Sequence, residues 1–214
     1  GRVDALGEAG DRGLLVAAAR ALGAVLAARG EHVPELVISV PVSARADTTT
    51  EQLGNQVGVM PVRVQVGGPR DAALAQVARG TTVRKSIRRG ASAALITPTF
   101  RLLAALGLFR PMIDRQRLVN SFLTNMRGPG QPMHLAGAAI RRIAPVTIAT
   151  GNVSVAFAAL SYADTLTISV IADPDLAPEL DDVAQALRRE LDGLAQGSSS
   201  RYPLRSDAAR SAAT

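Results

Sequence analysis

Helical and strand-like hydrophobic patterns alternate along the first half of the chain. Apolar residues recur at helical spacing over residues 12–29, which predicts a helix with Asp11 as its N-cap and Gly30 directly after its last turn. Residues 36–40 form an apolar, β-branched run that is typical of a buried strand. Residues 62–66 alternate apolar and polar side chains, which predicts a strand with one exposed face.

Three prolines mark the boundaries of the next elements. Pro61 puts the second strand at a sheet edge or at a bulge, because proline cannot donate a ladder hydrogen bond. Pro69 suits the first turn of a helix whose apolar positions extend to Ile87. A further helical stretch covers residues 91–109, with a bend or break near Pro98.

The second half of the chain is rich in strands. The predicted elements are, in order, strands at 118–126, 133–135 and within 138–148, a hairpin of 153–160 and 166–172, and a final helix at 178–194. The turn residues Arg127–Gly130 end the first of these strands. This order of helices and strands predicts a layered α/β or α+β fold with a mixed sheet, forming one domain over residues 1–195. The polar residues 196–214 are expected to be a disordered tail.

Composition excludes several kinds of chemistry. The 214 residues include no cysteine, so disulfides, thiolate nucleophiles and thiolate metal sites are ruled out. The two histidines, His32 and His134, are far apart in the sequence, and no metal-ligand spacing is present. No apolar run reaches the ~18–20 residues that span a bilayer, and no signal peptide is visible, so we expect a cytoplasmic protein.

The chain has a net charge of +6, and its densest basic cluster is Arg84–Arg89, in which i, i+4 pairs give a helix one positive face. Three interpretations remain open: a solvated face, contact with an anionic membrane surface, or nucleic-acid binding. Nucleic acid is the least favoured partner, because aromatic side chains that stack on bases are absent from the cluster.

Five segments in a fixed order carry a resemblance to a known family. They are Val40–Arg45 (similar to PVSLR), Leu53–Val57 (LGNRVS), Asn120–Pro129 (N-x-x-x-[ST]-N-V-P-G-P), Pro132–Ala138 (PLYLAGA) and Leu160–Tyr162 with Asp173 (LSYxG…AD). Together they resemble the C-terminal half of the bacterial wax ester synthase/diacylglycerol acyltransferase family. The resemblance implies a chloramphenicol-acetyltransferase-like fold, in which two similar halves meet along a tunnel.

The resemblance also implies an activity: transfer of an acyl group from acyl-CoA, as co-substrate and without a cofactor, to diacylglycerol or a long-chain alcohol. Its implied partners are an N-terminal half, these substrates, and the surface of the inner membrane or of lipid inclusions. The family's His-His-x-x-x-Asp-Gly motif, whose second His is the general base, belongs to that N-terminal half. Because the chain has no His-His pair and begins at Gly1, we expect half of an acyltransferase with no catalytic residue of its own.

Departures from the family pattern indicate divergence. The family's NDVVLA stretch falls on Asp11–Val16, so its Asn-Asp pair is missing, and Asp164 replaces the glycine of the hairpin. Met126-Arg127 stands where the family has Val-Pro.

The implied tunnel makes a few polar residues candidates for substrate contact. Asn125 and Asn120 lie on an apolar strand, where an amide either contacts substrate or caps a turn, and both interpretations stay open. Ser161 and Tyr162 are further candidates, although a hairpin turn explains them almost as well. Arg45 follows a buried strand and either pairs with a carboxylate or approaches the CoA phosphates. No metal ligands are predicted.

Two other functions remain as alternatives. The chain is either half of an enzyme or a catalytically inactive module that binds lipid or a protein partner. A half-fold exposes the apolar face that its other half would cover, so self-association is expected. A nucleic-acid binder is the third hypothesis.

Overall fold

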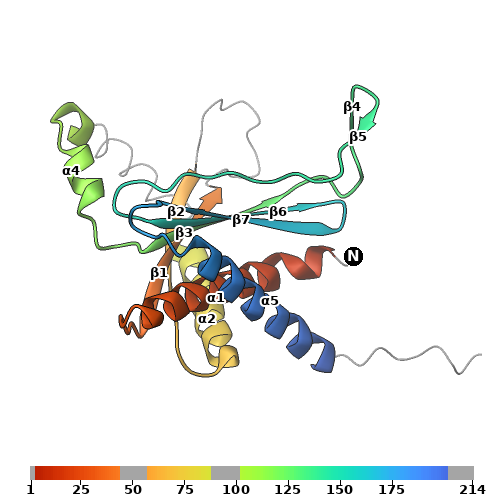
Figure 1. The fold of residues 1–214 in the computed structure, drawn as a ribbon, viewed down its shortest axis with the longest axis horizontal. Coiled ribbons are helices and arrows are strands. Elements are labelled where there is room, and N and C mark those ends of the chain that lie inside the picture. Colours follow the sequence, from red (N-terminus) through yellow and green to blue (C-terminus); the bar gives the residue numbers. More distant parts are fainter. Residues whose placement is uncertain (1–2, 44–56, 88–101, 202–214) are drawn as a thin grey trace, which may run out of the picture.

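The computed structural model describes residues 3–43, 57–87 and 102–201. Its elements, drawn in Figure 1, are α1 (Val3–Ala28), β1 (Glu35–Ser43), β2 (Val57–Gln65), α2 (Arg70–Ile87), α4 (Phe109–Asp114), β3 (Ser121–Arg127), β4 (His134–Leu135), β5 (Ala138–Ala139), β6 (Val155–Tyr162), β7 (Thr165–Ala172) and α5 (Leu180–Arg201). This is the α/β architecture that the element order predicts.

Five strands form one mixed sheet in the order β2-β1-β3-β6-β7. The central neighbours β1–β3 and β3–β6 are parallel, while β1–β2 and β6–β7 are antiparallel. The prediction that Pro61 marks a sheet edge is confirmed, because β2 is an outer strand and pairs only with β1 among the described strands. β4 and β5 form a separate two-stranded ribbon.

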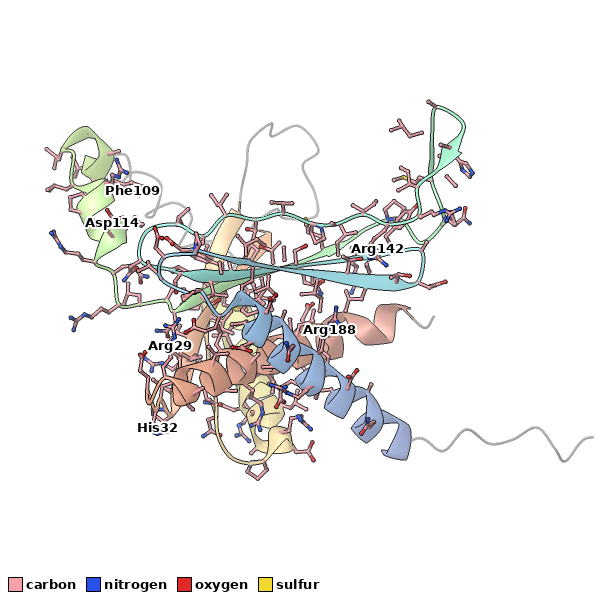
Figure 2. The ribbon with its side chains drawn as sticks, in the orientation of Figure 1. Arg29, His32, Phe109, Asp114, Arg142 and Arg188 are labelled. Atoms are coloured by element: carbon pink, nitrogen blue, oxygen red, sulfur yellow. The ribbon has the colours of Figure 1, made fainter. Side chains whose placement is uncertain are left out.

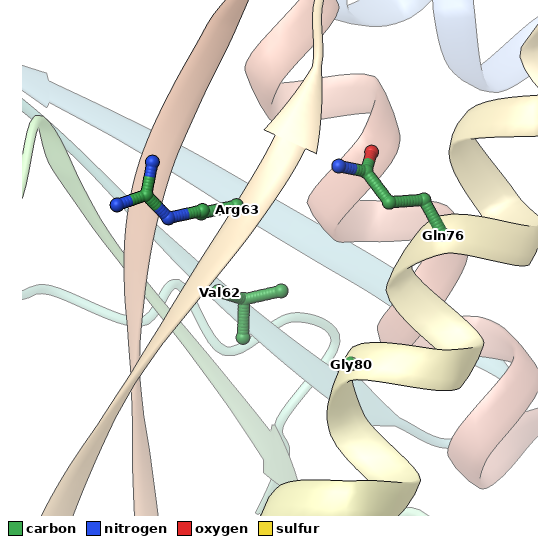
Figure 3. Close-up of a pocket in the computed structure, with 4 residues that line it drawn as sticks. All are labelled: Val62, Arg63, Gln76 and Gly80. Atoms are coloured by element: carbon green, nitrogen blue, oxygen red, sulfur yellow. The ribbon is translucent and has the colours of Figure 1, made fainter.

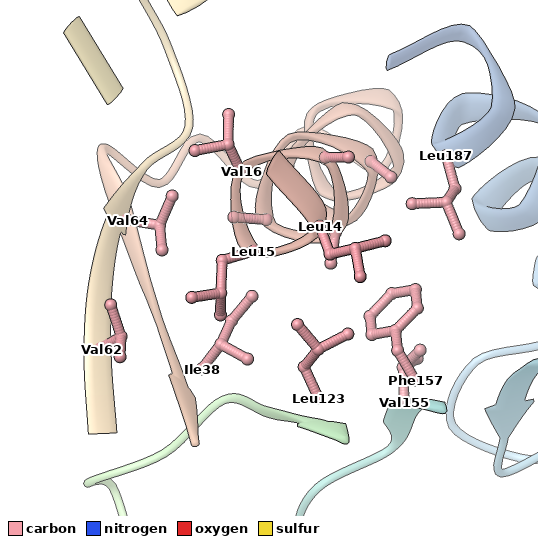
Figure 4. Packing of buried hydrophobic residues seen from close by; sticks show 14 of the residues in the cluster. Leu14, Leu15, Val16, Ile38, Val62, Val64, Leu123, Val155, Phe157 and Leu187 are labelled. Carbon is pink, nitrogen blue, oxygen red and sulfur yellow. The ribbon is translucent and has the colours of Figure 1, made fainter. Parts of the chain in front are cut away.

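Helices α1, α2 and α5 cover one face of the sheet (Figure 1). The core lies between these layers, and Figure 4 shows Leu14 and Leu15 of α1 close to Ile38, Leu123 and Phe157 of the strands. The three helices are also tied together at one carboxylate. Glu190 of α5 accepts hydrogen bonds from Arg20 of α1 (3.1 Å) and Arg70 of α2 (2.9 Å).

The predicted end of α1 is confirmed, whereas its predicted start is wrong. The helix begins at Val3 rather than after Asp11, because residues 3–11 continue the helical backbone although their apolar pattern is weak. The prediction of Asp11 as N-cap is therefore wrong. At the other end Gly30 has φ +83°, and its amide donates to Ala27 O while that of Glu31 donates to Leu26 O. This is a Schellman motif with Gly30 at C′, as predicted.

Other boundaries also differ from the prediction. The helix expected at 91–109 ends before Phe109, because the chain turns at Gly107 (φ +67°) and α4 begins separately; residues 88–101 lie outside the described part. β3 starts at Ser121 rather than Leu118. α5 continues to Arg201, into the tail predicted for 196–214, of which residues 202–214 are not described.

The strand expected within 138–148 is short, because only Ala138 and Ala139 pair. The following residues run along the face of the sheet opposite the helices (Figure 1), where no described strand is available for pairing. Pro145 is buried there, whereas Val146 is 83% exposed and Ile148 71% exposed. The apolar side chains of Val146 and Ile148 therefore both lie on the surface.

The predicted β6–β7 hairpin is confirmed. Tyr162 pairs with Thr165, so the connecting turn consists of Ala163 (φ +44°) and Asp164 (φ +63°). Two residues in the left-handed region are the requirement of a type I′ turn, which favours glycine. Asp164 therefore occupies a backbone conformation that the glycine of the family pattern would adopt without strain.

Candidate functional site at the carboxyl end of β3

Two candidate residues lie together where the parallel strands β3 and β6 end. The register places Asn125 opposite Ala159 and Arg127 opposite Ser161. Because side chains alternate along a strand, Asn125 and Ser161 lie on the helix side of the sheet, in line with the core residues Leu123 and Ala159. Gly128 then turns the chain away, and its amide donates to Ser161 O at 2.8 Å. The structure therefore joins two of the predicted positions.

Asn125 contacts a residue that the sequence analysis assigned to another role. Its amide nitrogen Nδ2 donates a hydrogen bond to Oδ1 of Asp11 at 2.5 Å, and both side chains are exposed. Asp11 lies within α1, so this contact joins the first helix to the end of β3. The signal in the sequence was the alignment of Asp11 with the first position of NDVVLA, which marked the residue but not its partner.

Tyr162 lies at the same end of the sheet but on the opposite face. Its ring is 3% exposed, and its hydroxyl accepts a hydrogen bond from Met133 N (2.7 Å) and donates one to Ile140 O (2.8 Å). These two bonds hold the base of the β4–β5 ribbon, whose tip turns at Ala136 and Gly137. The hydroxyl of Tyr162 therefore anchors the ribbon to the sheet.

Asn120 lies at the opposite end of β3. Its side-chain oxygen Oδ1 accepts a hydrogen bond from Val37 N, and its own amide donates to Val37 O, both at 2.8 Å. The residue thus extends the β1–β3 pairing by one position. Asn125 lies five positions further along the strand, about 17 Å away, so the structure does not bring the two amides to one site.

A polar group that the sequence analysis missed also lies at this amino end of β3. The side chain of Gln116 accepts hydrogen bonds from Leu118 N (2.7 Å) and Val119 N (2.9 Å) and donates to Val119 O (2.8 Å) and Asn152 Oδ1 (2.7 Å). Asn152 donates in return to Gln116 O. This knot uses backbone groups of residues 118–119 and explains why β3 begins only at Ser121.

Other candidates lie elsewhere. Arg45 lies outside the described residues, and so do Arg88 and Arg89 and the side chains of residues 84–87, whose backbone belongs to α2. His134 is exposed on β4, and His32 is exposed beyond the end of α1 (Figure 2). No group of three or more metal-ligating side chains occurs within the described ranges. Within them, no helix has both the length and the apolarity to span a membrane.

One ion pair near His32 shifts two pKa values. Arg29 donates to both carboxylate oxygens of Glu179, from Nε at 2.9 Å and from a terminal nitrogen, and that nitrogen also reaches Leu176 O. The hydrogen bond from Arg29 lowers the pKa of Glu179 and the hydrogen bond to Glu179 raises the pKa of Arg29. The pair ties the end of α1 to the start of α5, remote from Asn125.

A small pocket of about 170 Å³ lies between β2 and α2, lined by Val62, Arg63, Gln76 and Gly80 (Figure 3). Gln76 Oε1 also accepts a hydrogen bond from Gln65 N at 3.0 Å. Ligand pockets usually measure about 300–1,000 Å³. Because the pocket is smaller and none of the predicted site residues lines it, it is not the candidate site.

Comparison with known proteins decides the family. Residues 53–195 match the family described as the WS/DGAT C-terminal domain. The chain belongs to this family. The resemblance inferred from sequence motifs is thereby confirmed.

Two relatives of this WS/DGAT C-terminal domain are a putative diacylglycerol O-acyltransferase, Mb3154c, of Mycobacterium bovis and a probable one, Tgs1, of Mycobacterium tuberculosis. Each is 26% identical over 170 residues, which cover 76% of this chain and 37% of the relative. The domain therefore spans less than two fifths of the curated relatives it matches.

Solved structures support the same fold. A wax ester synthase/diacylglycerol acyltransferase from Marinobacter aquaeolei VT8 superposes with a TM-score of 0.68 at 20% identity, over 88% of this chain and 44% of that one. A starter condensation domain of the rhizomide synthetase RzmA, in a double mutant, superposes with a TM-score of 0.57 at 18% identity, over 87% and 41%. The expected chloramphenicol-acetyltransferase-like fold is confirmed.

Proposed function

We propose that this chain is the C-terminal half of an acyl-CoA-dependent O-acyltransferase whose acceptor is diacylglycerol or a long-chain alcohol, and that it forms one wall of the substrate tunnel. The observation that carries the proposal is its membership of the WS/DGAT C-terminal domain family. The names of its relatives specify the acyl transfer and the acceptors.

The catalytic base belongs, in this proposal, to a segment outside these residues. In the reaction an alcohol oxygen attacks the thioester carbonyl, a C–O bond forms, the C–S bond breaks and the CoA thiol leaves. The proton of the hydroxyl needs an acceptor, and histidine is the usual one. His32 follows the end of α1 that lies far from Asn125, and His134 is an exposed residue of the ribbon. The partial coverage of the relatives is consistent with a separate base.

The contribution of this half is then orientation rather than proton transfer. Asn125 offers an amide to a substrate polar group at the carboxyl end of β3, and Asp11 positions that amide through the observed hydrogen bond. Ser161 lies on the same face of the neighbouring strand. Asn120 and Tyr162 contact backbone groups instead, so we assign them no direct substrate contact. Arg45 is proposed to meet either a carboxylate or the CoA phosphates.

The test is to supply the missing half. The chain is joined to, or co-expressed with, a preceding segment that contains His-His-x-x-x-Asp-Gly, and thiol release from long-chain acyl-CoA is measured with diacylglycerol or a long-chain alcohol. We expect transfer by the completed protein and none by the isolated chain. Transfer by the isolated chain would contradict the assignment of the base. No transfer by a folded completed protein would favour an inactive lipid- or partner-binding module.

Self-association provides a second readout in the same experiment. The ribbon carries an exposed Leu135, and Val146 and Ile148 are exposed on the segment that crosses the sheet. We propose that the other half covers these side chains. The isolated chain is then expected to self-associate in solution and to become a discrete complex when that half is present, which a mass measurement resolves.

A further inference from the structure

Residues 102–118 form a projection at the amino end of β3, and α4 within it stands apart from α1, α2 and α5 (Figure 1). Its two short helical segments meet at a second Schellman motif: Leu108 N donates to Leu103 O, and Gly107 N donates to Ala104 O. The Gln116–Asn152 knot fixes the base of the projection to the sheet. The projection is therefore a structured feature with a defined attachment.

The projection exposes large apolar side chains. Leu102, Leu106, Leu108 and Leu118 are all more than half exposed, Leu118 at 78% and Leu106 at 61%, and no residue of α4 is buried. Isolated exposed leucines are ordinary, but several within 17 residues indicate a surface that contacts something apolar.

Positive charge accompanies these leucines. Arg110, Arg115 and Arg117 are exposed and form no salt bridge with a described residue. In the sequence, residues 84–118 hold eight of the 24 basic residues and one of the 18 acidic ones, a net charge of +7. The remaining residues hold 16 basic and 17 acidic side chains, a net charge of −1. The whole positive excess of the chain therefore comes from this stretch.

We propose that the 102–118 projection docks the protein on a lipid surface that carries anionic headgroups. Leucines enter the boundary between headgroups and acyl chains, while arginines contact lipid phosphates, a combination that binds anionic lipid and leaves neutral lipid weakly bound. Nucleic acid fits less well, because the most exposed large side chains here are leucines, which do not stack on bases. The inference rests on the proposed function only in that the acyl acceptors of that function are lipids.

The position of the projection agrees with this role. Asp11 and Asn125 meet at the carboxyl end of β3, whereas the projection leaves the sheet at the amino end. Docking at one end keeps the proposed substrate-binding end free for the other half of the enzyme.

Co-flotation with vesicles tests the proposal. The chain is mixed with phosphatidylcholine vesicles that contain or lack phosphatidylglycerol, and we expect binding only to the former, weakening as salt rises. Changing Arg110, Arg115 and Arg117 to Gln together is expected to weaken binding roughly a hundredfold. The double variant Leu106→Ser/Leu118→Ser is expected to weaken it by at least about tenfold.

Matched controls use the same chemistry elsewhere on the surface. Leu166→Ser/Leu176→Ser removes two leucines that are 48% and 56% exposed. The triple change of Arg142, Arg188 and Arg189 to Gln removes the same charge from exposed positions, and Figure 2 labels the first two of them. Both controls are expected to bind vesicles as the unchanged chain does. Three results would overturn the proposal. The control and test arginine triples could lose vesicle binding equally, or the chain could bind neutral and anionic vesicles equally. The chain could also bind duplex DNA but no vesicle.

Acyl transfer measured on detergent-dispersed substrate, with no vesicles present, separates this inference from the proposed function. Transfer by an unchanged completed protein that does not bind the anionic vesicles overturns docking alone. Vesicle binding by a completed protein that transfers nothing leaves docking in place and overturns the proposed function.

Discussion

The two ends of β3 carry the same amide side chain in different surroundings. Asn120, at the amino end, accepts a hydrogen bond from Val37 N and so acts as an extra rung of the β1–β3 pairing. Asn125, at the carboxyl end, donates a hydrogen bond to a side chain instead, the carboxylate of Asp11. A side-chain amide that hydrogen-bonds to the backbone contributes to stability. A side-chain amide that is oriented by a neighbouring side chain at an exposed position is available to a ligand. The following predictions test this difference.

The largest expected change in stability is at the amino end, in the Gln116 knot. Gln116→Ala removes four side-chain hydrogen bonds, two of which satisfy the amides of Leu118 and Val119. We expect the free energy of unfolding to fall by about 2–3 kcal/mol, measured by urea denaturation. Gln131→Ala, at an exposed position between β3 and the ribbon, is the matched control. Equal losses in the two variants would show that the knot contributes nothing specific.

The second prediction compares the two asparagines directly. Asn120→Ala is expected to cost about 1 kcal/mol of unfolding free energy, because Val37 N loses its acceptor. Asn125→Ala is expected to change it by less than about 0.5 kcal/mol, since the bond to Asp11 is exposed, yet to lower acyl transfer by the completed protein about tenfold.

A charge exchange sharpens this comparison. Asn125→Asp places two carboxylates side by side and removes the donor, so transfer should fall further. Adding Asp11→Asn restores a donor–acceptor pair with its partners exchanged and should recover part of the loss. A double variant no better than the single one would show that Asp11 does not position Asn125.

The smallest effect is expected at the Arg29–Glu179 pair, which lies far from the carboxyl end of β3. The pKa of Glu179 is lower in the folded chain than the ordinary value of a glutamate carboxyl, chiefly because of the hydrogen bond from Arg29. The pair therefore stabilises the fold above that value, and the contribution disappears as the pH falls through the lowered folded pKa. Glu179→Gln should flatten this part of the curve of unfolding midpoint against pH. An unchanged slope would show that solvent screens the pair completely.

The sequence predicted correctly those elements that depend on residues close together in the chain. The β6–β7 hairpin, the buried strand β1 and the Gly30 helix end follow from periodicity and turn chemistry within a few residues. The strand expected within 138–148 is confirmed only at Ala138 and Ala139, because the residues after them run along a face of the sheet, where no described strand is available for pairing.

The site was only partly predictable for a related reason. Family motifs marked Asn125 and Ser161, and strand register explains why they share a face. The partners of the two asparagines are 114 and 83 residues away in the sequence, so no local pattern reveals which amide serves the backbone. Gln116 escaped notice because a single glutamine between two arginines carries no signal of the turn that it stabilises.

Because α1 packs closely against the sheet, a shift of the helix at one point changes the position of residues elsewhere along it. At Gly23 a Cβ atom would overlap the side chain of Val66, so a larger residue there must displace either Val66 or the helix. Asp11 lies 12 residues earlier on the same rigid rod, about 18 Å along its axis. A small tilt at the glycine is therefore carried to the Asp11–Asn125 contact. The geometry of the proposed substrate-binding end therefore depends on Gly23, a residue without a side chain, 12 positions away along the helix.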